Sequence, residues 1–107
     1  MDNWRTQIRK GYLELCILSL IEKGEKLYGF ELLDLLEDKG LPVKEGTLYP
    51  LLNRMTNDGA LTARWQTRKK GHPRKFYYVT PNGRSQLTEM RSEFQRMNTI
   101  YGEIGEI

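Results

Sequence analysis

Apolar residues recur at helical spacing in segment 45–59. They are separated by three, four or seven positions, so they share one stripe of an α-helix: Leu48, Leu51, Leu52 and Met55. The opposite face carries polar groups that can hydrogen-bond base edges or phosphates, none of them acidic: Thr47, Tyr49, Asn53, Arg54 and Asn57. The segment predicts a helix that could read DNA, although an ordinary solvated surface helix has the same pattern.

The start of this helix depends on Pro50, which has no backbone N–H to donate. If Thr47 is the N-cap, Pro50 lies in the first turn and no helical hydrogen bond is lost. If the helix begins near Lys44, Pro50 removes one bond and bends the axis slightly. The sequence leaves both starts open.

Two further helices are predicted before this segment, over residues 4–22 and 28–39. The first is apolar on almost its whole circumference from Leu13 onward, which indicates burial on several sides. Its N-terminal half carries only a narrow apolar stripe that needs cover from elsewhere: Trp4, Ile8 and Tyr12. The second helix has leucines on one face and acids on the other, and it ends at Gly40.

After Gly59 the pattern becomes one of alternation, which is typical of β-structure. Residues 61–66 and 76–79 predict two antiparallel strands joined by a polar loop, 67–75. The loop holds a cluster of cations: Arg68, Lys69, Lys70, Arg74 and Lys75. Alone, such a cluster would indicate only a solvated loop. Directly after a candidate recognition helix, it predicts a wing whose cations contact DNA phosphates.

The last helix is predicted to open at Thr80, with Thr80 as N-cap and Pro81 at the first helical position. From there apolar residues step by three and four: Leu87, Met90, Phe94, Met97, Tyr101 and Ile104. This helix could pack on its own domain, but a stripe so narrow and regular favours a partner helix. We therefore expect a homodimer interface formed by this seam together with Trp4, Ile8 and Tyr12.

The length and the charge of the chain limit the classes of function that it can have. A chain of 107 residues with 38% hydrophobic and 29% charged residues suits one small domain. The formal net charge is only +3, but segment 59–88 contains no acid and seven Lys or Arg, which implies a polyanionic partner there. Neither Cys16 nor His72 has an adjacent catalytic partner, so we expect no enzyme, no metal and no cofactor. We see no secretory signal or membrane span, and so expect a cytoplasmic protein.

Three stretches resemble the PadR family of bacterial transcriptional regulators: LYGFELLDLL, EGTLYPLLNRMTNDGAL and GHPRKFYYVTPNG. The resemblance implies a winged helix-turn-helix fold, dimerisation through the C-terminal helix aided by the N-terminal one, and repression at a promoter. Positions that face DNA in such proteins match Tyr28, Thr47, Tyr49 and Arg54, and the basic pair of the wing matches Arg74 and Lys75. Tyr78 departs from the Arg often found at its position.

The sequence therefore predicts a mainly α protein with a small β-hairpin: a winged helix-turn-helix plus a C-terminal dimerisation helix. Residues 1–80 form the DNA-binding domain and 81–107 the dimerisation helix. The expected function is a sequence-specific, DNA-binding repressor that acts as a homodimer on a near-palindromic promoter site. The alternative is a winged-helix module that grips another protein and does not bind DNA.

An effector site at the dimer centre is a further hypothesis. Aromatics and flexible methionines would meet there and could hold a planar hydrophobic compound stacked on Phe94 or Trp4: the candidate residues are Trp4, Ile8, Phe94 and Met97. The resemblance points the same way, because some drug-sensing PadR-like proteins stack ligands on an aromatic of this helix. The alternative is a closed interface core without a ligand, because nothing in the sequence demands a cavity.

Overall fold

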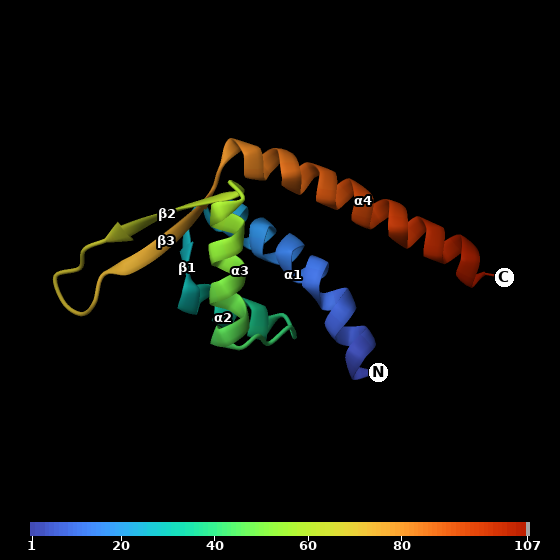
Figure 1. Ribbon diagram of the computed structural model, residues 1–107, viewed down its shortest axis with the longest axis horizontal. Helices are drawn as coiled ribbons and strands as arrows, with labels where there is room; N and C mark the ends of the chain where they lie inside the picture. Colours follow the sequence, from blue (N-terminus) through green and yellow to red (C-terminus); the bar gives the residue numbers. More distant parts are fainter. Residues whose placement is uncertain (107) are drawn as a thin grey trace.

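The most apolar part of the sequence lies at the centre of the fold, within helix α1 (Asp2–Gly24). The computed structural model describes residues 1–106, and these form four helices and three strands (Figure 1). The remaining elements, in order, are β1 (Leu27–Tyr28), α2 (Gly29–Asp38), α3 (Glu45–Asn57), β2 (Leu61–Gln66), β3 (Arg74–Val79) and α4 (Pro81–Gly105). The mainly α winged helix-turn-helix predicted from the sequence is confirmed. The last residue of the predicted 81–107 helix lies outside the described residues.

One hydrophobic core joins all the helices and the root of the sheet. Its fully buried side chains come from α1, α2, α3, β2 and α4: Ile17, Leu18, Ile21, Leu32, Leu36, Leu48, Leu52, Leu61 and Leu87. Each such side chain stabilises the fold by about 1.5–3 kcal/mol relative to an exposed one. The inward leucines of α2 and the apolar stripe of α3 are thus core residues, as their spacing predicted.

The sheet contains a strand that the sequence analysis missed. Its order is β1-β3-β2 and both pairings are antiparallel, so β1 extends the predicted hairpin to three strands. Strand β1 has only two residues, Leu27 and Tyr28, and a segment this short cannot show the alternating pattern that predicts a strand. Strand β3 also begins earlier than predicted, because Arg74 and Lys75 pair with Gln66 and Trp65 instead of belonging to the loop.

Helix α3 begins at Glu45 with Lys44 as its N-cap, which decides the question that Pro50 left open. Pro50 lies inside the helix, so the bond that residue 50 would donate to the Gly46 carbonyl is missing. Thr47 is therefore not the N-cap. The helix ends before Gly59, whose φ of +88° is a left-handed conformation that favours glycine.

Helix α4 starts at the cap that the sequence predicted. The Thr80 hydroxyl accepts a hydrogen bond from the Gly83 N–H at 2.9 Å and donates one to the Gly59 carbonyl at 2.6 Å, which ties the helix start to the turn after α3. Leu87 completes the core, so the first turns of α4 pack on the domain formed by residues 1–80.

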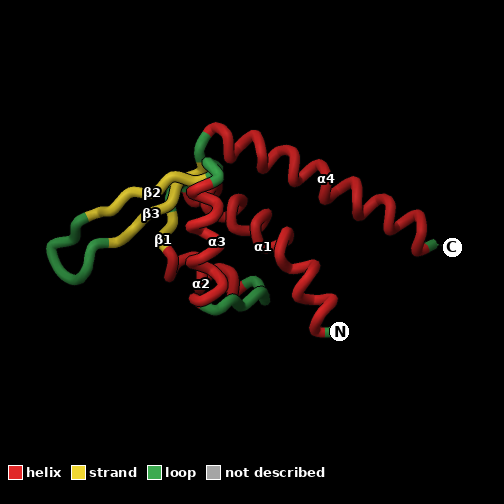
Figure 2. The backbone as a smooth tube through the Cα atoms, viewed as in Figure 1, coloured by secondary structure: helices red, strands yellow, loops and turns green. Residues whose placement is uncertain are grey.

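The outer parts of α1 and α4 extend beyond the core on the side opposite the wing, the hairpin β2–β3 with its loop (Figures 1 and 2). Both chain ends lie on that side, and the molecule measures 60 × 31 × 22 Å. The fold thus places the helix α3 between a projecting hairpin and two projecting helices.

Candidate nucleic-acid interface

The face of α3 that points away from the core is polar. Leu48, Leu52 and Met55 are buried, whereas Thr47, Asn53, Arg54 and Asn57 are exposed. Their hydroxyl, amide and guanidinium groups can donate to or accept from base edges and phosphates. The acids near this face are Glu45 and Asp58, at the two ends of the helix, and Glu14 of α1, which pairs with Arg54. The geometry is that of a helix able to enter a DNA groove.

Tyr49 lies differently from the other polar residues predicted on this face. It is half-buried, and its hydroxyl packs so closely on α2 that a Cβ added at Gly29 would lie 2.3 Å from that oxygen. Burial, and secondarily the charge of Glu45, raises the pKa of the Tyr49 phenol. Tyr49 therefore joins the start of α2 to α3, and only its remaining exposed part is free for a DNA contact.

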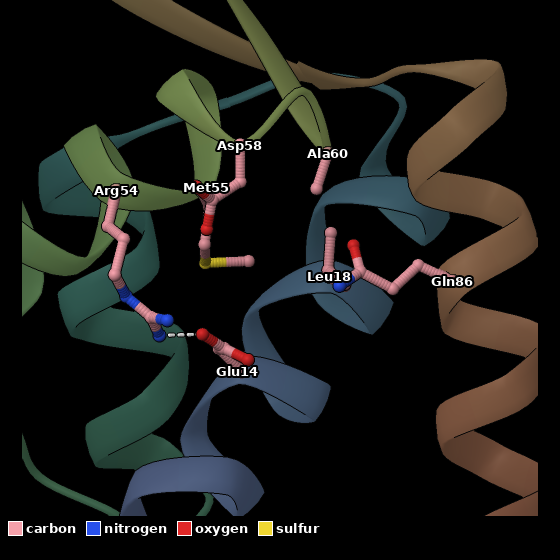
Figure 3. A pocket seen from close by; sticks show the side chains of 7 residues that line it. All are labelled: Glu14, Leu18, Arg54, Met55, Asp58, Ala60 and Gln86. Atoms are coloured by element: carbon pink, nitrogen blue, oxygen red, sulfur yellow. Dashed lines mark ion pairs between the residues drawn. The ribbon is translucent and has the colours of Figure 1, made fainter.

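Arg54 points toward α1, where it forms an ion pair with Glu14 (Figure 3). The Arg54 side chain is 57% exposed and that of Glu14 is 21% exposed, so the pair lies at the rim of the core. A small hollow of about 50 Å³ surrounds it, lined also by Asp58 and Gln86. No local pattern indicates this partner, because Glu14 stands forty positions earlier, in an apolar run.

The cations of the wing lie on both faces of the hairpin. The tip holds three exposed ones, Arg68, Lys69 and Lys70. In the strands, side chains alternate between faces, so the predicted basic pair Arg74 and Lys75 is divided between them. A hairpin with cations on both faces suits a narrow DNA groove, where each face meets the phosphates of a different strand.

Tyr28, at the sheet edge, contacts one cation and one aromatic ring. The Arg74 guanidinium lies 4.4 Å from the centre of the Tyr28 ring, and the Phe76 ring meets Tyr28 edge-on at 5.4 Å. The Lys26 ammonium lies 4.6 Å from the Phe76 ring. On the other face, Trp65 is 69% exposed, with the Lys75 ammonium 5.9 Å from its ring. The sequence analysis did not single out Lys26 or Trp65, whose roles depend on strand register.

The acids near this surface do not neutralise it. Within residues 1–106, the wing cations form no ion pair with Asp or Glu. Their neighbours in the strands are aromatic or uncharged, so their charge remains available to a polyanion.

A second, apolar surface covers the projecting helices. Its residues from α1 are Trp4, Ile8 and Tyr12, and those from α4 are Phe94, Met97, Ile100, Tyr101 and Ile104, all between 38% and 73% exposed. The Tyr12 and Phe94 rings meet at 5.6 Å, so the two helices contribute to one surface, which we call the α1–α4 face. Of the predicted seam, Met90 is half-buried and Leu87 is fully buried in this chain's own core. Leu87 therefore belongs to the core of this chain, and Ile100, which the sequence analysis did not name, lies on the α1–α4 face.

Outside these surfaces, Cys16 is a partly buried free thiol in α1. Within residues 1–106, no group of His, Cys, Asp and Glu has metal-binding geometry. Burial raises the pKa of the Cys16 thiol, more than its hydrogen bond with Tyr12 lowers it, which disfavours the nucleophilic thiolate. The same residues include no helix long and apolar enough to cross a membrane.

Comparison with known proteins links this geometry to regulators. Residues 17–89 match the model of the Transcriptional regulator PadR-like family. A PadR-like transcription factor from Bacteroides fragilis superimposes with a TM-score of 0.83 at 41% identity, covering 96% of this chain and 99% of the other. A PadR family regulator from Eggerthella lenta superimposes with a TM-score of 0.88 at 30% identity, covering 98% of this chain and 91% of the other. A transcriptional regulator from Mycobacterium tuberculosis is 38% identical over 72 residues, which are 67% of this chain and 66% of the relative.

Proposed function

Because the chain belongs to the PadR-like family of transcriptional regulators, we propose that it represses transcription by binding a near-palindromic DNA site as a homodimer. The observation that carries the proposal is the exposed polar face of α3 beside a hairpin of unpaired cations. A target on DNA also implies a cytoplasmic location.

The two parts of this surface have different tasks in the proposal. Thr47, Asn53 and Arg54 read base edges from α3, because hydrogen bonds to bases distinguish sequences. The wing contacts phosphates, which are the same in every sequence. The Tyr28 phenol and the exposed part of the Tyr49 ring lie against the sugar–phosphate backbone, with Arg74 held in position by its stacking on Tyr28.

The wing is tested by replacing Lys69, Lys70 and Arg74 with Ala and titrating fluorescent duplexes at several salt concentrations. Lost phosphate contacts weaken binding to operator and random DNA alike. They also lower the slope of log K against log salt by roughly one unit per contact. A Lys23→Ala variant, which removes an exposed cation outside the wing from the C-terminal end of α1, is the matched control. An unchanged slope in the triple variant would exclude these residues from the phosphate contact.

Dimerisation is proposed through the α1–α4 face. An apolar surface of this extent on projecting helices is unusual for a monomer, and large side chains at close spacing suit the packing of two helices against a two-fold-related copy. Such a dimer presents two copies of α3 to successive turns of one face of the duplex, which is why the expected site is near-palindromic.

The interface is tested with Phe94→Glu, since Phe94 stands at the junction of the two helices. Burying one unpaired charge per chain, together with the loss of about 1.5–3 kcal/mol of apolar burial, shifts the equilibrium strongly toward monomer. Ser92→Glu adds the same charge to an exposed position on another side of α4 and leaves the dimer intact. Sedimentation at micromolar concentration distinguishes these results. A Phe94→Glu protein that stays dimeric would place the interface elsewhere.

Experiments can distinguish two alternatives from the proposed DNA-binding repressor. A protein-binding module without DNA affinity would show no salt-dependent retention on immobilised duplex DNA. The planar hydrophobic effector, proposed for the centre of the α1–α4 face near Trp4, Ile8, Phe94 and Met97, would release DNA only if it preferred a subunit spacing unlike the DNA-bound one.

A further inference from the structure

A groove lies between the N-terminal half of α1 and the turn between α2 and α3. Its volume is about 540 Å³, within the range of sites for small organic molecules. It is a different place from the α1–α4 face. At 3.6 residues per turn, the groove residues of α1 and the stripe through Trp4 and Ile8 lie roughly 150° apart around the helix. A partner chain on the α1–α4 face therefore leaves the groove accessible.

The floor of the groove is aliphatic. Its apolar side chains are those of Leu13, which is 7% exposed, and of Leu41, Pro42, Val43 and Leu51. Among residues 1–106, no aromatic side chain lines it. Such a surface favours a flexible alkyl group over a flat ring, because it offers apolar area without a stacking face.

Three cations stand at the edge of this aliphatic floor: Arg9 and Lys10 from α1, and Lys44 from the N-cap of α3. Within the described residues none of the three is in an ion pair, and no acid lines the groove. The hydroxyls of Thr6 and Thr47 are the other polar side-chain groups in its lining. Unpaired positive charge around an apolar depression complements a molecule with one anionic head and an alkyl tail.

We propose that this groove binds a medium-chain aliphatic carboxylate, with the carboxylate between Arg9, Lys10 and Lys44 and the alkyl chain over Leu13 and Val43. The site is a separate proposal from the planar compound at the dimer centre. Its consequence for DNA rests on the proposed function. Lys44 and Thr47 belong to the start of α3, so an anion held there repels phosphate and competes with DNA binding.

The direct test is calorimetric titration of the full chain with sodium hexanoate, octanoate and decanoate, each below its micelle concentration. We expect one molecule per chain and an affinity that rises about fourfold per added methylene, since each buried CH₂ contributes a nearly constant transfer free energy. Decyltrimethylammonium, with a tail one carbon longer than that of decanoate and the opposite charge, should not bind. Equal affinity for hexanoate and decanoate, or for the cationic analogue, would overturn the proposal.

Variants locate the site. Arg9→Ala with Lys10→Ala lies on an exposed helix half and should fold normally, while weakening decanoate binding at least tenfold. Val43→Asp adds a repelling carboxylate to the floor and should abolish binding, and Lys23→Ala should change nothing. Helical circular dichroism checks each fold. Decanoate binding that survives in Arg9→Ala/Lys10→Ala but is lost in Phe94→Glu would assign the ligand to the α1–α4 face and refute the groove.

Fluorescence anisotropy with operator DNA separates the two proposals. Decanoate should weaken DNA binding of the native chain and not of Arg9→Ala/Lys10→Ala. If the chain binds decanoate in the groove but binds no DNA, the proposed function fails and the site stands. If the native chain does not bind decanoate, while Arg9→Ala/Lys10→Ala lowers the salt slope of DNA binding, these cations contact phosphate and the site proposal fails.

Discussion

Glu14 and Arg54 provide a test in which two halves of one ion pair should have opposite effects on DNA binding. The pair joins α1 to α3 (Figure 3), and Arg54 is also a proposed base-reading residue. Glu14→Gln removes the negative partner and leaves Arg54 in place. Arg54→Ala removes the pair and the base contact together.

The expected effect on stability is small and has the same sign for both variants. The side chains are 57% and 21% exposed, so solvent screens the pair and its loss costs about 0.2–1 kcal/mol. Glu22→Gln is the matched control, since Glu22 also links α1 to another helix through Arg91, at 3.9 Å with 34% and 51% exposure. Thermal midpoints at one fixed protein concentration measure the three changes.

The effects on DNA should diverge. A lost base contact costs about 1–3 kcal/mol, so Arg54→Ala should weaken operator binding roughly 5- to 150-fold while changing random-DNA binding much less. Glu14→Gln frees Arg54 and removes a charge that repels phosphate, so it should tighten binding by roughly twofold or more. In the double variant, Glu14→Gln should add little to Arg54→Ala, because Arg54 is no longer present to be freed.

Fluorescence anisotropy titrations with operator and random duplexes measure the DNA affinity of each variant. The operator sequences are first selected from a random pool of duplexes. Equal losses on both duplexes for Arg54→Ala would reduce Arg54 to a backbone contact. If Glu14→Gln weakened operator binding as much as Arg54→Ala, the ion pair would act by holding α3 in place, and the reasoning above would be refuted.

Two further predictions concern the start of α4 and the dimer centre. Gly83→Ala places a Cβ 2.1 Å from the Ala60 carbonyl oxygen and should lower the free energy of unfolding by about 1–3 kcal/mol, whereas Gly46→Ala, with nothing within 4 Å, should be neutral or slightly stabilising in urea titrations. If a planar effector binds the α1–α4 face, planar dyes should quench Trp4 emission in a Trp65→Phe background. Absence of quenching at every soluble concentration would leave that face as an interface only.

Much of the fold could be predicted from the sequence because its signals are local. The stripe of α3, the alternation of β2, and the cap formed by Thr80 and Pro81 each depend on residues a few positions apart. The cationic loop of the wing and the apolar stripe at Trp4 and Ile8 could also be predicted from the sequence, because the charge and the apolar spacing of a segment do not depend on the rest of the chain.

Only the tertiary structure shows the contacts between segments that are far apart in the sequence. Two-residue β1 exists because β3 supplies its hydrogen-bond partners, and no local pattern of two residues can encode that. Arg54 meets Glu14, and Tyr49 packs on Gly29, only after α1, α2 and α3 have assembled around the core. Leu87 and Phe94 continue one heptad seam in sequence, yet the core buries the first and leaves the second 38% exposed, because α4 leaves the domain between them. Spacing along a helix specifies which residues share a face, whereas the rest of the chain determines what that face meets.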